Sequence, residues 1–233
     1  MQPTAETLMG IKLFDDLRIE ARKDVAKRCQ IRQFAKGQEI LHDLDETNDV
    51  YFIVSGSVRA IIFSISGKEV AFRDIGAGEV FGDLAAIDGM PRSTSVVALE
   101  DCSVLSMSAH EFWEVMEVYP SVAAGIMRRL TDLVRRLSER VVEFSTLGVK
   151  NRIHAELLRL ARDHMASENT AEINPAPTHA DISSRISTHR EAVTRELNHL
   201  EDAGLIARPC GSIIVLDVAR LTKMVEDVKG AYA

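Results

Sequence analysis

Long apolar runs and paired cysteines are both missing from this chain. No stretch of about 18 uncharged apolar residues occurs, and the first 14 residues hold no basic segment followed by an apolar run. The sequence thus indicates neither a membrane span nor a secretion signal, and we expect a cytoplasmic protein. The three cysteines, Cys29, Cys102 and Cys210, stand far apart, which argues against a disulfide framework, a zinc site or a cysteine-bound cluster. We expect them to be small core residues.

The usual sequence marks of an enzyme are also lacking. The seven histidines show no metal-ligand spacing, no serine stands in a nucleophile elbow, and no Walker loop occurs. The acidic run at residues 43–49 has neither the central glycine nor the terminal glutamate of a calcium loop, so we expect a solvated loop between strands. We predict a protein without catalytic activity or a bound metal.

Acidic residues outnumber basic ones, mainly in the first part of the chain. The formal net charge is −7, with 17 basic and 23 acidic residues up to Leu147 and 11 and 12 after it. The C-terminal part can still place its arginines on one face, where the local field attracts phosphate. With 233 residues, of which 46% are hydrophobic, the chain is long enough for two domains.

Short apolar runs separated by glycine fill the N-terminal half. Strands are predicted at residues 34–41, 50–54, 58–64, 69–75, 95–99 and 103–107, with turns near Gly37, Gly56, Gly67, Gly76, Gly78 and Gly82. Short strands at this spacing are typical of a small antiparallel barrel or roll. A helix is predicted before them, at residues 19–29.

A long helix is predicted at residues 121–144, after Pro120. Its apolar residues alternate at spacings of four and three: Ala123, Met127, Leu130, Val134, Leu137, Val141 and Phe144. This pattern indicates a coiled-coil seam of three heptads. Ile126 and Leu133 lie off the seam, so we expect one face to pack on the roll and the other on a second copy in a symmetric dimer. The alternative is a single amphipathic helix that covers only its own core.

A second group of helices is predicted beyond a hinge around Gly148. A helix is expected at residues 151–165, followed by a polar loop at 166–177 that has room for a short strand. Two capping-box spacings, Thr178 with Asp181 and Thr188 with Glu191, then mark two helix starts about ten residues apart.

Such a pair around a turn at residues 186–189 predicts a helix-turn-helix. Gly204 ends the second helix, and apolar runs at 205–207 and 213–216 predict a two-stranded wing.

The second helix of this pair has one polar and one apolar face. At about 100° per residue, Arg190, Glu191, Thr194, Arg195 and Asn198 share an arc of about 140°, and Ala192, Val193, Leu197 and Leu200 lie opposite. Arginine binds guanine O6 and N7 with two hydrogen bonds, and a carboxylate accepts from cytosine N4, so the polar arc is suited to reading the major groove. The alternative is that Glu191 caps its helix and pairs with Arg195 on a solvated face.

These features together resemble the cyclic AMP receptor protein (catabolite activator) and fumarate-nitrate regulator superfamily of bacterial transcription regulators. The resemblance spans nearly the whole chain and implies an α+β fold. Its parts would be an N-terminal cyclic-nucleotide-binding antiparallel β-roll (1–119), a long dimerisation helix with a hinge (120–147) and a C-terminal winged helix-turn-helix (148–233). It also implies double-stranded DNA and RNA polymerase as partners of a homodimer.

The segment at residues 187–197 is similar to the family's recognition helix. Arg190, Glu191 and Arg195 fall on its three base-reading positions, which implies a palindromic site with TGTGA-like halves. His189 and Thr194 are expected to contact the DNA beside them. Ser187 stands in the turn where the family often has glycine.

Residues 81–94, FGDLAAIDGMPRST, resemble the family's phosphate-binding cassette. Arg92 could bind two oxygens of a cyclic phosphate, and Gly82 allows close backbone approach. Amides of the next turn, at Leu84, and the hydroxyl of Ser93 would add donors. Asp83 would accept from the ribose 2′-hydroxyl, although its side chain is one methylene shorter than the usual glutamate. The alternative is a weak salt bridge between Arg92 and Asp83 at the rim.

The resemblance also implies that recognition of the base depends on two adjacent polar residues of the long helix. By offset from Arg152 and Ile153 these positions are Leu137 and Ser138. Leucine cannot hydrogen-bond an exocyclic amine, and the loss of such a contact costs about 1–3 kcal/mol. We therefore expect cyclic AMP to be the allosteric ligand and cyclic GMP to bind as well.

Ligand binding would set the two recognition helices of the dimer about 34 Å apart, one turn of B-DNA. Alternatives with the same fold are a sensor of haem or redox state and a ligand-independent DNA binder.

Overall fold

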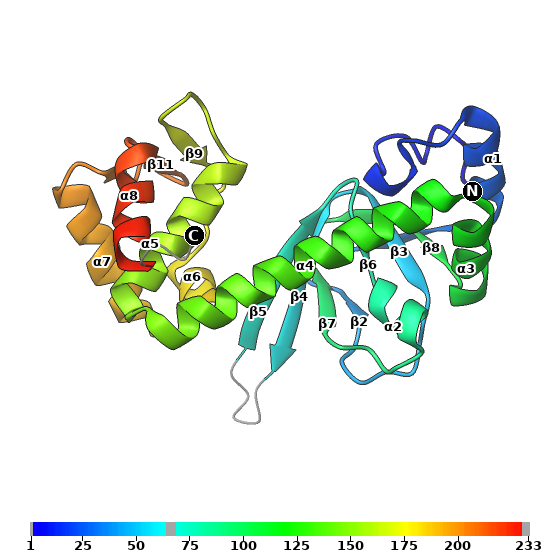
Figure 1. The fold of residues 1–233 in the computed structure, drawn as a ribbon, viewed down its shortest axis with the longest axis horizontal. Coiled ribbons are helices and arrows are strands. Elements are labelled where there is room, and N and C mark those ends of the chain that lie inside the picture. Colours follow the sequence, from blue (N-terminus) through cyan, green and yellow to red (C-terminus); the bar gives the residue numbers. More distant parts are fainter. Residues whose placement is uncertain (1, 64–68, 230–233) are drawn as a thin grey trace. The chain divides into compact units, whose positions relative to one another are not determined.

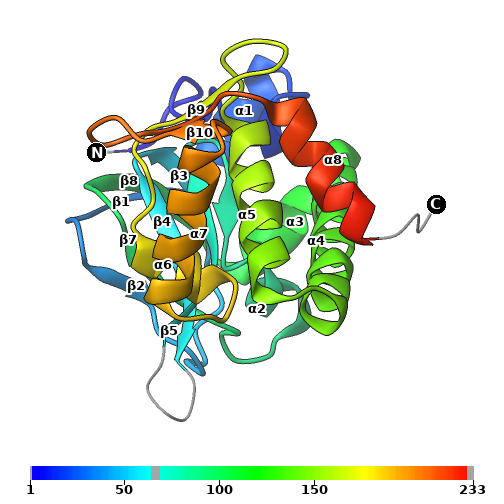
Figure 2. The same cartoon turned by 90° about the vertical axis from the view of Figure 1, so that its left-hand side faces the viewer.

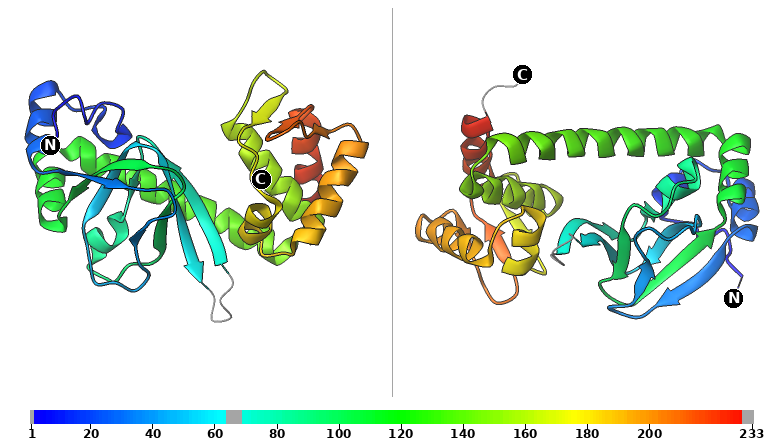
Figure 3. Two further views of the ribbon diagram at one scale, coloured as in Figure 1. Left: turned by 180° about the vertical axis from the view of Figure 1, so that it is seen from behind. Right: turned by 90° about the horizontal axis from the view of Figure 1, so that it is seen from below.

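The computed structural model describes residues 2–63 and 69–229 and divides within helix α4 (Pro120–Thr146) into two compact units, Met1–Leu133 and Val134–Ala233 (Figure 1). Ser64 and Gly67, a predicted strand end and turn glycine, lie outside the described residues. Helix α4 is one unbroken helix, as predicted (Figure 3).

Two four-stranded antiparallel sheets form the roll of the first unit. Their strand orders are β1-β8-β3-β6 and β2-β7-β4-β5. The strands are β1 (Gln30–Phe34), β2 (Glu39–Leu41), β3 (Val50–Ser55), β4 (Ser57–Phe63), β5 (Glu69–Gly76), β6 (Val80–Phe81), β7 (Ser95–Ala98) and β8 (Cys102–Met107). The predicted antiparallel roll is confirmed.

The single strand predicted at residues 34–41 is wrong. Strand β1 ends at Phe34 and β2 begins at Glu39, and the two strands belong to different sheets. Between them Gly37 adopts a φ of +79° and donates its N–H to the carbonyl of Ala98 at 2.8 Å. Glycine adopts this left-handed conformation readily, so the chain can turn here from one sheet into the other.

Helices cover the outer face of the sheet that contains β3 and β8. Helices α1 (Ile19–Lys27), α3 (Ala109–Val118) and the start of α4 share one apolar core with it. Phe14 and Phe112 are fully buried in this core, and their ring centroids lie 4.9 and 6.3 Å from that of Phe52. A second apolar layer lies between the two sheets and includes Tyr51, Ile53, Phe81, Val96 and Val104. Helix α3 was not predicted from the sequence.

The apolar faces of α4 are only partly those predicted. Ile126 is 3% exposed in the core of the first unit, and Leu133 is half-buried. Ala123 and Leu130, which belong to the predicted seam, also pack partly on that core. The remaining five seam residues, Met127, Val134, Leu137, Val141 and Phe144, are 39–64% exposed. The start of the seam therefore serves this chain's own core, and the rest of it is uncovered.

The second unit is a helical bundle with a small sheet. Its elements after α4 are α5 (Val149–Asp163), β9 (Ala171–Ile173), α6 (His179–Arg185), α7 (Arg190–Asp202), β10 (Ile206–Ala207), β11 (Ile213–Val215) and α8 (Val218–Lys229). Helix α5 lies between α7 and α8 (Figure 2). The wing strands β10 and β11 are joined by β9, so the short strand allowed for in residues 166–177 is present. Helix α8 was not predicted.

One of the two predicted helix caps is correct. Thr178 and Asp181 form a capping box at the start of α6, with hydrogen bonds of 2.9 and 3.1 Å. The box predicted at Thr188 is wrong, because α7 has His189 as its N-cap and no side-chain cap. Thr188 is buried instead, and its N–H donates to the carbonyl of Ser183 across the turn.

The cysteines differ in burial. Cys29 and Cys102 are buried, as predicted, whereas Cys210 is exposed in the turn of the wing, so the expectation of a core residue is wrong there. Burial raises the pKa of the Cys29 thiol to about 12, which keeps it protonated at neutral pH.

Candidate functional site

Arg92 is a buried cation whose hydrogen-bond acceptors are all neutral. Its side chain donates to Thr47 Oγ1 at 3.0 Å, to the carbonyl of Gly82 at 2.9 Å and to the carbonyl of Asp49 at 2.9 Å. The residue is 2% exposed, and burial lowers the pKa of its guanidinium. Within residues 2–63 and 69–229 no carboxylate forms an ion pair with it. A guanidinium fixed in place without a counterion is suited to binding an anion.

The acidic loop between β2 and β3 holds Arg92 in this position. The N–H of Leu44 donates to the carbonyl of Arg92 at 2.9 Å, and the N–H of Arg92 donates to the carbonyl of Asp45 at 2.8 Å. Thr47 and Asp49, farther along the loop, bind the side chain. The prediction of a loop between strands is confirmed, and the loop has the additional role of orienting the guanidinium.

Gly82 lies directly against that guanidinium. Its φ is +76°, and a Cβ there would lie 2.9 Å from Arg92 Nη1 and 3.0 Å from the carbonyl oxygen of Asp49. A larger residue would therefore clash and be strained. The expected approach of the Gly82 backbone to a phosphate stays a prediction.

Asp83 opens helix α2 (Asp83–Asp88) and pairs with Arg129 of α4 rather than with Arg92. Two hydrogen bonds join them, Arg129 Nε to Oδ2 at 2.9 Å and Nη2 to Oδ1 at 3.1 Å. Asp83 is 3% exposed, so the alternative of a rim salt bridge between Arg92 and Asp83 is wrong. Sequence reasoning missed Arg129, because nothing in the helical pattern distinguishes it from the exposed Arg128.

The other predicted cassette residues lie at the surface beside these two arginines. Leu84 is 37% exposed in the first turn of α2, and Ser93 is exposed next to Arg92. The far end of α2 is held by Trp113 of α3, whose indole N–H donates to the carbonyl of Ala86 at 3.0 Å. Trp113 was also missed. Leu137 and Ser138, the predicted base contacts, are exposed on α4.

The exposed face of α7 contains the predicted DNA-reading residues. Val193, Leu197 and Leu200 are at most 1% exposed on the opposite face. The open hollow on the polar side is lined by Arg190, Glu191, Thr194, Arg195 and Asn198. Glu191 and Arg195 form no ion pair with each other in the part of the chain that the structure describes. The predicted division into two faces is therefore confirmed, and the arginines of the polar face are free to bind another molecule.

Two neighbours fix polar groups on this face. Nδ1 of His179 lies 2.7 Å from Oγ1 of Thr194, and burial, followed by the charge of Arg208, lowers the pKa of that imidazole. Arg208, between the two wing strands, donates to Oδ1 of Asn198 at 2.7 Å and binds Glu201. His189, another expected DNA contact, is exposed as the N-cap of α7.

The turn before α7 is tight although it lacks glycine. Ser187 adopts a φ of +51°, a region that residues other than glycine rarely occupy. The following N–H, of Thr188, donates to Ser183 at 3.0 Å, so the turn closes on α6. Ser187 therefore adopts a conformation that glycine would adopt with less strain.

Neither a membrane helix nor a metal cluster is found in the described ranges 2–63 and 69–229. No helix there is long and apolar enough to cross a bilayer, and no three His, Cys, Asp or Glu side chains are grouped to hold a metal ion.

Two family models match the two units. Residues 31–119 match the cyclic nucleotide-binding domain, and residues 151–224 match the Crp-like helix-turn-helix domain. The chain is 30% identical over 191 residues to the cAMP-activated global transcriptional regulator CRP of Salmonella typhimurium, which covers 80% of this chain and 90% of that protein. It is 28% identical over 220 residues to the cyclic AMP receptor protein of Thermus thermophilus, covering 93% and 98%.

Solved structures of other proteins have the same fold. A CooA mutant from Carboxydothermus hydrogenoformans aligns with a TM-score of 0.77 at 19% identity over 87% of this chain and 90% of that one. FixK2 from Bradyrhizobium japonicum aligns with 0.73 at 20% identity, over 88% and 99%. These two likenesses show the fold alone. The family models and the sequence relatives establish that the chain belongs to the cyclic AMP receptor protein and fumarate-nitrate regulator superfamily of DNA-binding transcription regulators.

Proposed function

We propose that this regulator binds cyclic AMP in the first unit and, as a liganded homodimer, binds a palindromic TGTGA-like operator. The observation that carries the proposal is Arg92, a guanidinium that is 2% exposed and donates to three neutral acceptors. A cyclic phosphodiester has one delocalised negative charge, which matches this one uncompensated positive charge. Ser93 and the amides near Gly82 and Leu84 would supply further donors to the phosphate.

The pair between Asp83 and Arg129 supports a ribose site next to the phosphate site. A carboxylate has about four lone-pair positions, and the guanidinium fork uses two of them. Asp83 can therefore accept a hydrogen bond from the ribose 2′-hydroxyl while Arg129 keeps its charge balanced. The relatives named for cyclic AMP are consistent with such a ligand.

Discrimination between bases is expected to be weak. Of the two proposed base contacts, Ser138 can hydrogen-bond an exocyclic group and Leu137 cannot. We therefore propose cyclic GMP as a second ligand of the same site. Comparable calorimetric dissociation constants for the two nucleotides would agree with this, and strong preference for one would contradict it.

The uncovered part of α4 supports the homodimer. Val134, Leu137, Val141 and Phe144 recur at spacings of three and four and are 39–64% exposed. Apolar residues at this spacing are covered when two such helices pack as a coiled coil. Sedimentation should give a dimer, and Val141→Glu should give a monomer; a monomeric wild-type chain fully active on its operator would contradict the proposal.

The face of α7 supports the choice of operator. Arg190, Glu191 and Arg195 are exposed, and His189 and Thr194 flank them. Two such faces in a dimer would read two halves of a palindrome one turn of DNA apart. RNA polymerase is the proposed further partner of the DNA-bound dimer.

One titration tests the ligand and the DNA together. Fluorescence anisotropy of a TGTGA palindrome and of a scrambled duplex is measured with cyclic AMP, cyclic GMP or neither, alongside calorimetry of each nucleotide. We expect operator affinity to rise about 5- to 150-fold with cyclic AMP. No heat from either nucleotide would refute the ligand, equal operator binding in all three conditions would show a ligand-independent binder, and a coloured preparation would indicate haem or an iron–sulfur cluster.

A further inference from the structure

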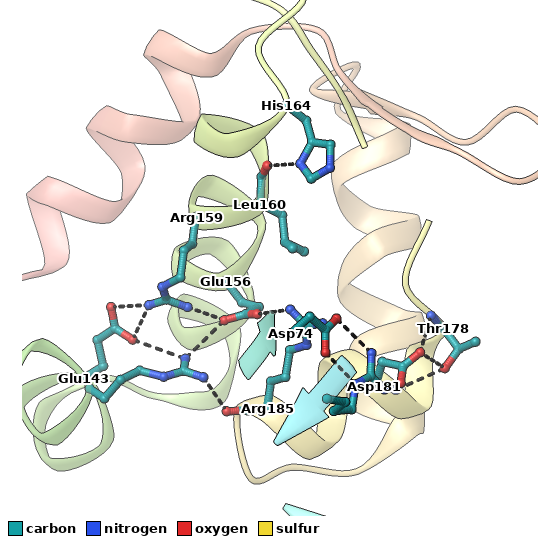
Figure 4. A network of polar contacts seen from close by, with 11 residues as sticks. Asp74, Glu143, Glu156, Arg159, Leu160, His164, Thr178, Asp181 and Arg185 are labelled. Carbon is teal, nitrogen blue, oxygen red and sulfur yellow. Dashed lines mark hydrogen bonds and ion pairs between the residues drawn. The ribbon is translucent and has the colours of Figure 1, made fainter. Parts of the chain in front are cut away.

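Five charged side chains form a compact cluster in the second unit where the end of α4 meets α5 and α6 (Figure 4). They are Arg140, Glu143, Glu156, Arg159 and Arg185. The carboxylates of Glu143 and Glu156 are only 4% and 2% exposed. Buried carboxylates remain ionised only when cations compensate them, so the three arginines and two glutamates form one interdependent group.

Each glutamate is bound by more than one guanidinium. Nη2 of Arg159 donates to both oxygens of Glu143 at 3.0 Å, and Arg159 also bonds to Glu156. Nη1 of Arg140 donates to Glu156 at 3.1 Å, and Arg185 approaches the other oxygen of Glu156 at 3.4 Å. Arg159 thus joins α4 to α5, and Arg185 joins α6 to α5.

Arg140 is also bonded to the backbone before the recognition helix. Its Nη2 donates to the carbonyl of Arg185 at 2.8 Å while Nη1 remains on Glu156. Arg185 is the last residue of α6, where carbonyls lack helical partners and a cation is favourable. The turn of Ile186, Ser187 and Thr188 follows directly and leads into α7. The Arg140 side chain of α4 therefore contacts the backbone directly before the turn that leads into α7.

We propose that Arg140 is a positioning residue for the recognition helix α7. Through its two hydrogen bonds, Arg140 couples the position of the end of α4 to that of the turn before α7. The inference rests on the proposed function for its biological use, because the same helix would form the dimer seam. The guanidinium is a rigid plane, with one nitrogen bonded to the Glu156 carboxylate of α5 and the other to the Arg185 carbonyl at the end of α6. A shift of α4 relative to α5 then moves the turn or breaks a hydrogen bond, and either event alters the placement of α7.

The test compares Arg140→Gln and Arg140→Lys with Arg135→Gln, which removes an exposed arginine of the same helix. Arg140→Lys keeps a positive charge beside Glu156 and so preserves the fold, but one ammonium cannot replace both guanidinium nitrogens. Three quantities are measured on the full-length protein: amide hydrogen exchange at residues 184–188, the ratio of operator to scrambled-DNA affinity, and the ratio of operator affinity with and without cyclic AMP.

We expect both Arg140 variants to exchange the turn amides at least about tenfold faster, with α8 unchanged. Both affinity ratios should fall toward one, while calorimetric binding of cyclic AMP stays within about twofold of wild type. Turn exchange equal to that of Arg135→Gln would overturn the proposal. Uniformly faster exchange across the second unit in Arg140→Lys would also overturn it, because it would show a merely structural role. The exchange measurement needs no nucleotide, so it tests the role of Arg140 even if the wild-type protein does not bind cyclic AMP.

Discussion

Arg92 and Arg195 place the same guanidinium in opposite surroundings. Arg92 is 2% exposed and held by three protein acceptors, whereas Arg195 is exposed and lies in an open hollow. A small ion offers few contacts, so a site for it gains affinity when its groups are already oriented. A DNA groove offers many contacts to a helix that docks into it as a rigid body. Side chains on such a helix can therefore bind without being oriented beforehand. The two regions thus differ in how much of their geometry exists before binding.

Loss of the oriented guanidinium should have the largest effect. Arg92→Leu removes charge-assisted hydrogen bonds of about 1.5–3 kcal/mol each, so calorimetry should show at least roughly a hundredfold loss of nucleotide affinity. The carbonyls of Gly82 and Asp49 lose their donor at the same time, so the melting temperature should also fall. Arg32→Leu is the matched control, because Arg32 also lies over the Tyr51 ring but is more exposed. Unchanged cyclic AMP binding by Arg92→Leu would place the site elsewhere.

Removal of the exposed Arg195 guanidinium should weaken operator binding far more than binding to scrambled DNA. Arg195→Ala should weaken operator binding by about 1–3 kcal/mol per half-site, roughly fivefold or more for each, and scrambled DNA far less, because a bidentate base contact is lost. Gel shifts on both duplexes measure this, with Arg162→Ala on the exposed surface of α5 as the control. Equal losses on both duplexes would indicate a phosphate contact.

Arg129, the second arginine of the proposed nucleotide site, should matter less than Arg92, because it would act on the ligand through Asp83. Arg129→Gln leaves Asp83 without its fork, so we expect cyclic AMP affinity to fall about tenfold, in line with the loss of charge-assisted bonds of about 1–2 kcal/mol. The penalty for 2′-deoxy cyclic AMP should shrink at the same time, because Asp83 no longer meets the 2′-hydroxyl. Arg128→Gln, one residue away and exposed, should change neither value. An unchanged deoxy penalty in Arg129→Gln would separate Arg129 from the ribose site.

Acid should have the smallest effect, on the second unit only. His154 of α5 is 2% exposed and lies 2.7 Å from Glu196 of α7, and burial lowers its pKa although Glu196 opposes this. The unfolded chain then binds a proton on this imidazole more readily than the folded chain does. The free energy of unfolding therefore falls as the pH drops from about 6.5 toward the lowered pKa of folded His154, and this group has no effect on it at higher pH. Melting scans from pH 7.5 to 5.5 should show a fall of a few degrees that His154→Gln reduces and His189→Gln does not. A pH dependence unchanged in His154→Gln would contradict this assignment.

Local patterns predicted the parts of the molecule that local chemistry determines. The capping box at Thr178 and the two faces of α7 follow from spacing within one or two turns, and the structure confirms both. Helix α3 carries an equivalent signal, a capping box of Ser108 and Glu111, that could have revealed it. The false box at Thr188 shows the limit, because the closing turn buries this side chain and the helix starts one residue later.

Contacts between distant segments were not predictable in this way. Asp83 and Arg129 are 46 residues apart, and Arg140 and the carbonyl of Arg185 are 45 apart. Helical periodicity assigns each arginine to a face, but it does not say which carboxylate or carbonyl that face will meet. The strand at residues 34–41 failed for the same reason, because its two halves pair with different partners, β8 and β7.

The sequence by itself determined the succession of roll, long helix and helix-turn-helix, the cassette with its arginine and the polar face of α7, because backbone propensities, glycine and helical periodicity act over a few residues. Only the tertiary structure decided which cations are paired and which are uncompensated. Arg129 and Arg140 are paired, Arg92 is buried with no carboxylate paired to it among the described residues, and Arg195 is exposed. The physical reason is that burial and charge pairing depend on which helices and strands pack together, and packing joins residues that are far apart in the chain.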